Sequence, residues 1–105
     1  MKILIVGASG LVGSHLFREA KARGHEPFGG GLSDLKTLWA ALGRKDHFDP
    51  VDLEVSAIRN ERPDVVIHSA GFTHVEGCQA DPVRCSDENY HQPIRLAGVC
   101  GELGI

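Results

Sequence analysis

Short apolar runs separated by longer segments with a different period constrain the fold of this chain more than any other feature. Residues 2–7 (KILIVG) and 64–71 (DVVIHSAG) are rich in β-branched side chains and end in glycine. Such continuous apolar runs are typical of strands buried on both faces. Weaker strand patterns follow at 25–30 and 47–49. The sequence therefore predicts strands at all of these ranges.

The segments between the predicted strands repeat their apolar side chains with helical spacing. Residues 11–23 and 33–42 each present an apolar stripe, which indicates amphipathic helices. Residues 52–62 are predicted as a further helix, which ends before Pro63 because a residue before proline is biased away from helical geometry. A last helix is predicted over 81–103, because Asp-Pro at its start suits a capped first turn. Pro93 lies inside this helix and should bend or split it. Strands and helices thus alternate along the whole chain.

This alternation predicts an α/β fold of the Rossmann type. Sequential βαβ units give a parallel sheet with right-handed crossovers. We expect a partial, doubly wound sheet of about four strands in the order 3-2-1-4, with helices on both faces. A chain of 105 residues allows a single domain, so the prediction covers residues 1–105 as one unit.

Composition and charge exclude several classes of protein. The formal net charge is −3, so no basic field points to nucleic acid as a partner. No apolar run approaches the length of a transmembrane helix or of the core of a signal peptide. We therefore expect a cytoplasmic protein with neither nucleic-acid nor membrane partners.

Cysteines and histidines are the side chains to test for metal binding or catalysis. The spacing of Cys78, Cys85 and Cys100 fits no zinc motif, and an odd number argues against a disulfide framework. We expect reduced thiols that pack between helices. The histidines fall on different predicted elements without an i, i+4 pair, so no metal site is predicted. His68 suits a core position, and only His74 lies in a loop where a functional role is a candidate.

Three evenly spaced glycines follow the first strand and open the first helix. Gly7 lets the chain turn off the strand, Gly10 lets a diphosphate approach the backbone, and Gly13 lets the helix pack closely on the sheet. Free N–H groups and the positive end of the helix dipole attract the anion there. Ser9 adds a hydroxyl donor. The alternative is a glycine-rich turn that serves packing alone.

The sequence of this loop, GASGLVG, resembles the cofactor loop of the extended short-chain dehydrogenases/reductases in the NAD-dependent epimerase/dehydratase superfamily. Residues 48–89, from FDPVDLE to RCSDEN, are similar to the dTDP-4-dehydrorhamnose reductases and the related methionine adenosyltransferase regulatory subunit. The resemblance covers essentially the whole chain. It implies the NAD(P)-binding part of an oxidoreductase that transfers hydride at a sugar carbon of a nucleotide sugar.

The resemblance also implies a set of binding residues at the carboxyl ends of the strands. Those implied to bind the cofactor are Gly7, Ser9, Gly10, Leu11, Val12 and Gly13 at the diphosphate, Asp49 and Pro50 by the adenine, and Ser69, Ala70 and Gly71 along the ribose and nicotinamide. Those implied on the substrate side are Thr73, Val75 and Asn89. Structural alternatives are a turn made by Asp49, a hydrogen bond of Asn89 within the core, and a simple need for a small residue at Ser69.

The choice between NAD and NADP depends on the end of the second strand. An NAD site usually carries an acid about 20 residues beyond the glycines to bind the ribose hydroxyls, but the sequence there, near Gly31, is GGGLSD. Without a carboxylate nothing repels a 2′-phosphate, which favours NADP slightly. Ser33 and Lys36 are candidates to contact that phosphate, although the expected Arg is missing. Asp34 is an alternative, displaced acid.

The catalytic pair of the resembling family is missing from this sequence. Those enzymes use Tyr-x-x-x-Lys, whereas Tyr90 is followed four residues later by Ile94. We expect no catalytic residue in these 105 positions and a nucleotide-sugar partner only where a second half is present. The alternative function is a stand-alone, non-catalytic dinucleotide-binding regulatory module. We also expect residues 64–70 to form an exposed sheet edge that favours self-association, because the neighbouring strand of the resembling family is missing.

Overall fold

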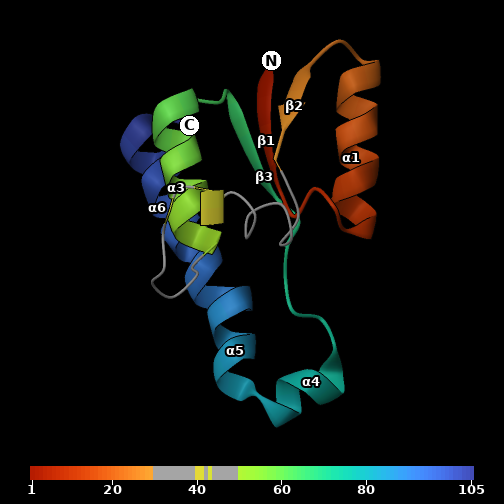
Figure 1. Cartoon of the computed structure of the whole chain (residues 1–105), viewed down its shortest axis with the longest axis vertical. Helices are drawn as coiled ribbons and strands as arrows, with labels where there is room; N and C mark the ends of the chain where they lie inside the picture. The colour runs from red at the N-terminus through yellow and green to blue at the C-terminus, as the bar shows by residue number, and fades with distance from the viewer. Residues whose placement is uncertain (30–39, 42, 44–49) are drawn as a thin grey trace.

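A parallel sheet forms the centre of the protein in the computed structural model, which describes residues 1–29, 40–41, 43 and 50–105. Within these residues the sheet is three-stranded, in the order β2-β1-β3 (Figure 1). The strands are β1 (Lys2–Val6), β2 (Glu26–Phe28) and β3 (Val65–His68). The predicted α/β class with parallel pairing is confirmed. The strand expected at 47–49 and most of the helix expected at 33–42 lie outside the described residues.

The central strand β1 carries the core on both of its faces. Ile3, Leu4, Ile5 and Val6 are all buried, and Ile5 is fully inaccessible. Alternate residues of a strand point to opposite faces, and Leu4 and Val6 belong to one apolar cluster. The short strand β2 tolerates Pro27, which has no N–H. Only every second residue of a strand donates to the same neighbour, and in β2 this donor is Glu26, whose N–H bonds Met1 O (2.8 Å).

Helices cover both faces of this sheet, as Figure 1 shows. Helix α1 (Leu11–Ala22) lies on one face, and α3 (Pro50–Glu61) and α6 (Gln92–Leu103) lie on the other. The core cluster joins Leu4 and Val6 to side chains of both helices, namely Val51, Ile58, Leu96 and Val99. No helix within the described ranges is long and apolar enough to cross a membrane.

Two ion pairs show that α3 and α6 run side by side in the same direction. Asp52 near the start of α3 pairs with Arg95 near the start of α6 (2.6 Å). Arg59 and Glu102 pair near the two carboxyl ends (3.0 Å). All four side chains are partly exposed, so these ion pairs contribute little to the stability of the fold. Their main effect is to fix how α3 and α6 are aligned along each other.

The last predicted helix is split, as Pro93 requires. The segment begins with α5 (Pro82–Ser86), passes through a π-helical turn (Asp87–His91) and continues as α6. In that turn the N–H of Gln92 donates to Asp87 O, five residues back, which widens the helix directly before the proline. The predicted cap is also present, since Asp81 Oδ1 accepts from the N–H of Arg84 (3.0 Å).

A short additional helix precedes this segment, at residues where the sequence predicts a loop. Helix α4 (Val75–Ala80) is capped by His74, whose Nδ1 accepts from the N–H of Gly77 (2.8 Å). Together α4 and α5 project beyond the carboxyl edge of the sheet (Figure 1). A histidine cap is uncommon, which explains why the sequence pattern predicts no helix start there.

Candidate functional site

The glycine loop turns at the carboxyl end of β1 and leads into α1. Gly7 has φ +82°, a value that L side chains rarely adopt, and a Cβ there would lie 2.8 Å from Ala70 N. A Cβ on Gly13 would overlap Gly7 O and lie 2.8 Å from Ser69 Oγ. Both glycines are therefore required by the fold itself, the first for the turn and the second for close packing of α1.

Gly10 differs from Gly7 and Gly13 because nothing in the fold requires it to be glycine. Its φ of −73° and ψ of 174° suit any residue. A Cβ there would meet only Gly7 O, at an ordinary 3.4 Å. The absent side chain leaves open space directly in front of α1.

The start of α1 is an exposed, uncapped helix terminus. Gly10 supplies no side-chain cap, and the first turn contains no acidic residue. The first intrahelical bond is from Ser14 N–H to Gly10 O (2.9 Å), so the N–H groups of Leu11, Val12 and Gly13 have no acceptor within the helix. Leu11 and Val12 are 79% and 61% exposed. This arrangement favours an anionic ligand.

The end of β3 lies directly beside the glycine loop. Ser69 Oγ donates to Val6 O (2.7 Å), and the N–H of Ser69 donates to the same oxygen (2.9 Å). The hydroxyl therefore joins the ends of β1 and β3, a structural role beyond the simple need for a small residue. Ala70 and Gly71 follow and are exposed. Contacts of these three residues with a cofactor remain predictions.

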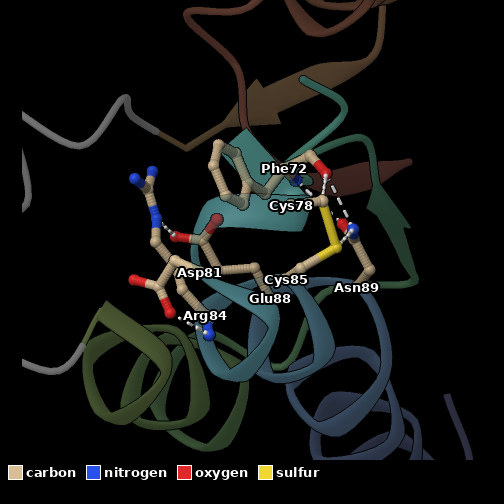
Figure 2. Close-up of polar contacts among 7 residues, drawn as sticks. All are labelled: Phe72, Cys78, Asp81, Arg84, Cys85, Glu88 and Asn89. Atoms are coloured by element: carbon tan, nitrogen blue, oxygen red, sulfur yellow. Dashed lines mark hydrogen bonds and ion pairs between the residues drawn. A yellow bond between two sulfur atoms is a disulfide. The ribbon is translucent and has the colours of Figure 1, made fainter. Parts of the chain in front are cut away.

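Asn89 reaches from the π-helical turn back to the segment after β3, as Figure 2 shows. Its Nδ2 donates to Phe72 O (2.8 Å), and its Oδ1 accepts from the N–H of Phe72 (2.8 Å). Oδ1 also lies where a Cβ on Gly71 would be only 3.0 Å away. The amide of Asn89 thus clamps the backbone at Phe72, and a contact with substrate remains a prediction.

The expectation of reduced cysteines is wrong for two of them. Cys78 of α4 and Cys85 of α5 form a disulfide, with a Cα–Cα distance of 5.0 Å, and Cys100 is free. An odd count of cysteines does not exclude a single pair, because the third thiol can stay free. The break between two helices at Asp81 and Pro82 brings the pair together, and a seven-residue separation across such a break was the available signal.

Three of the other predicted site residues fall within the described part of the chain. Thr73 and Val75 are exposed, on the connection to α4 and at its first residue. Pro50 is the first residue of α3. Gly31, Ser33 and Asp49 lie outside the described residues. His74 serves as a helix cap, and the described part of the chain contains no group of three or more His, Cys, Asp or Glu residues that could hold a metal ion.

Burial changes the acidity of two groups near the open edge of β3. It lowers the pKa of His68 below its ordinary value, partly offset by a backbone hydrogen bond. It raises the pKa of the Cys100 thiol, so this thiol is less reactive than a free one in water. Both groups border one groove between β3 and α6. The effect keeps both groups uncharged near neutral pH.

Comparison with known families gives one match that covers nearly the whole chain. Residues 3–105 match the profile of the NAD dependent epimerase/dehydratase family.

Individual relatives agree with this match. The chain is 31% identical over 105 residues to the probable low-salt glycan biosynthesis reductase Agl14 of Haloferax volcanii, covering 100% of this chain and 35% of the relative. It is 31% identical over 103 residues to dTDP-4-dehydrorhamnose reductase of Streptomyces griseus, covering 96% of this chain and 30% of the relative. The chain therefore spans about a third of the length of these curated relatives.

Solved structures show the same architecture. The Thermus thermophilus UDP-glucose 4-epimerase in complex with NAD superposes with a TM-score of 0.76 at 26% identity, over 100% of this chain and 35% of that one. The Bacillus anthracis dTDP-4-dehydrorhamnose reductase in complex with NADP gives a TM-score of 0.76 at 18% identity, over 98% of this chain and 33% of that one. The second likeness shows the fold alone.

Proposed function

Because the chain belongs to the NAD dependent epimerase/dehydratase family, we propose that it is the NAD(P)-binding part of a nucleotide-sugar reductase or epimerase. Relatives of both kinds support this proposal. The chain spans about a third of their length, so the complete reaction would need further residues in addition to these 105.

The environment of Gly10 is the main structural support for this proposal. The fold explains Gly7 and Gly13, but leaves Gly10 with an ordinary backbone and an unfilled space beside it. That space lies in front of the unpaired N–H groups of Leu11 and Val12. A diphosphate fits this combination, because it needs close backbone approach and gains from N–H donors aligned with a helix dipole.

In this proposal each part of the carboxyl edge has its own task. The start of α1 holds the diphosphate, with Ser9 as an added donor. Asp49 and Pro50 lie by the adenine, Ser69, Ala70 and Gly71 border the ribose and nicotinamide, and Thr73, Val75 and Asn89 border the substrate. The bound dinucleotide supplies the hydride chemistry, which these residues support by positioning the cofactor. Tyr90 does not act as the catalytic acid, since Ile94 stands where the lysine would be needed.

We propose in addition that NADP is preferred to NAD. The sequence after β2 has no carboxylate at the position, near Gly31, where one would repel a 2′-phosphate. Ser33 is a candidate donor to that phosphate. Titration of the same protein with NADPH and NADH should give the lower Kd for NADPH, and a lower Kd for NADH would overturn this preference.

Calorimetric titration with NADPH tests the proposed site. Gly10→Val places a branched side chain in the unfilled space and should abolish measurable binding while the protein stays folded. Gly98→Val is the matched control, because a Cβ on Gly98 meets nothing within 4 Å and the residue lies on α6, away from the loop.

The two variants distinguish a loss of NADPH binding at the loop from a general effect of replacing a glycine with valine. We expect the Gly98 variant to bind as the parent does, and circular dichroism should show both variants folded. Unaltered NADPH binding by folded Gly10→Val would show that the diphosphate does not lie at this loop.

A further inference from the structure

The Cys78–Cys85 disulfide lies in a part of the protein that has no core of its own. Helices α4 and α5 have six and five residues, and neither contains a buried residue. Helices this short are not stable without tertiary contacts. Helix α5 continues through the π-helical turn into α6, which packs on the core, whereas the order of α4 depends on local links. The disulfide is the only covalent one of these among the described residues.

Several other links of this segment are polar contacts at exposed or partly exposed positions, and the Phe72 ring also packs against Gly77 of α4. The Arg84 guanidinium lies over the Phe72 ring, 3.9 Å from its centroid, and pairs with Glu88 at 3.4 Å. Asp81 caps α5. Each contact of this kind contributes little on its own at an exposed site. Loss of the disulfide would leave the segment to these weak contacts.

Both sulfurs of the disulfide touch the clamp between Asn89 and Phe72, as Figure 2 shows. Cys78 Sγ lies 3.3 Å from Phe72 O, a contact without a hydrogen while the disulfide is intact. Cys85 Sγ lies 3.4 Å from Asn89 Nδ2, which also donates to Phe72 O. Reduction would separate the sulfurs and give Cys78 an S–H able to compete for that oxygen.

The clamp in turn borders the glycine loop. Phe72 follows Gly71, where an added Cβ would lie 3.0 Å from Asn89 Oδ1, and Ala70 fills the space where a Cβ on Gly7 would lie. A change at Phe72 is therefore three residues or fewer along the chain from atoms packed on the turn that precedes α1. This path is continuous along the chain.

We propose that the Cys78–Cys85 pair is a thiol–disulfide switch that sets the order of residues 72–89 and, through them, the affinity of the glycine loop for a dinucleotide. The affinity part rests on the proposed function. In the oxidised state the clamp is held and the loop is presented in its binding form. In the reduced state the segment loosens and binding weakens.

The switching step is ordinary exchange with a dithiol. One thiolate of the reductant attacks a protein sulfur, the Cys78–Cys85 bond breaks, and a mixed disulfide forms. The second thiol of the reductant closes its own disulfide and releases the protein sulfur. Two electrons pass from the reductant to the protein, and Cys78 and Cys85 each end with a proton. Both cysteines are partly exposed, which allows the reductant access.

Titration with NADPH in the two redox states tests the switch. Thiol counting after denaturation should give one free cysteine in the oxidised protein and all three after treatment with dithiothreitol. We expect reduction to raise Kd by about fivefold or more, the lower end of common coupling between sites.

The double variant Cys78→Ser/Cys85→Ser should have the higher Kd with or without dithiothreitol. Cys100→Ala, the matched control, should keep the full redox effect.

Hydrogen exchange gives a readout that needs no ligand. The N–H groups of Phe72, Gly77 and Arg84, which are bonded to Asn89, His74 and Asp81, should exchange faster in the reduced protein and in the double variant. Equal exchange in both redox states would overturn the switch. Equal Kd values would overturn its control of binding.

Failure of the proposed function gives a different result. In that case neither redox state binds NADPH or NADH, while exchange at Phe72 still reports whether the disulfide orders the segment. A redox effect that disappears in Cys100→Ala would assign the response to the free cysteine and also overturn the proposal.

Discussion

At the scale of single residues, three glycines with equal spacing have unequal roles. Gly7 and Gly13 are fixed by a positive φ and by contacts that leave no room for a Cβ, whereas Gly10 has neither constraint. The motif predicted the turn at Gly7 and the close packing of α1 at Gly13, and both are present. The role that the motif predicted for Gly10, close approach of a diphosphate, stays a prediction, and the fold leaves that position free for it.

Alanine substitution at Gly13 and Gly10 should separate these roles. Gly13→Ala drives a methyl group into Gly7 O and Ser69 Oγ, and should destabilise the fold by about 1–3 kcal/mol, the usual cost of overpacking. Gly10→Ala should change stability by less than about 0.5 kcal/mol, as at an unconstrained surface site. Urea unfolding measures both. Similar decreases in the free energy of unfolding for the two variants would contradict these separate roles.

The lowered pKa of His68 predicts a pH-dependent stability. The unfolded chain binds a proton near pH 6.5, whereas the folded chain binds it only at lower pH. The contribution of neutral His68 to the free energy of unfolding is therefore fully present above about pH 6.5. It is lost as the pH falls from there through the lower pKa of the folded state. His68→Gln should reduce the drop in urea midpoint between about pH 7.5 and 5.5. An unchanged drop would show that other groups cause it.

At the scale of elements, apolar patterns located the parts of the fold that depend on burial. The continuous apolar run of β1 matches the core cluster, because burial and sequence pattern have the same physical origin. The helices predicted at 52–62 and 81–103 also supply core side chains, from α3 and α6. Helix α4 and the disulfide were missed, since short elements held by a histidine cap and a covalent link leave no periodic pattern. Asn89 was predicted to be near the site, but its clamp on Phe72 depends on tertiary placement.

Ile58 is the residue through which the packing of α3 can be tested. It is fully buried in the cluster that joins β1, α3 and α6. Ile58→Ala should lower the free energy of unfolding by about 2–5 kcal/mol, from lost burial and the cavity that remains. Val55→Ala, at a partly buried position of the same helix, should cost less. Equal losses for the two variants would place the centre of the core elsewhere.

At the scale of the whole molecule, β3 is an edge of the sheet within the described residues. Its apolar residues are only partly buried and border the groove that also contains Leu96, Cys100 and Ile105. An apolar, β-branched edge pairs readily with another chain. This property is separate from the proposed dinucleotide site, which lies at the carboxyl edge.

Self-association through this edge is the expected consequence. Sedimentation velocity over rising concentration should show dimers or larger species, and Val65→Lys should reduce them by placing a charge on the edge. A monomer that persists at high concentration, or association unaffected by Val65→Lys, would contradict pairing through β3.

Binding of a dinucleotide's diphosphate by backbone amides at the start of α1 is the property on which the proposed function depends. The most direct measurement is a two-dimensional ¹H–¹⁵N NMR titration of this chain with NADP. If the diphosphate binds there, the amides of Leu11 and Val12, whose N–H groups have no acceptor within the helix, should shift most and saturate together. Shifts concentrated elsewhere, with these amides unmoved at saturation, would contradict it.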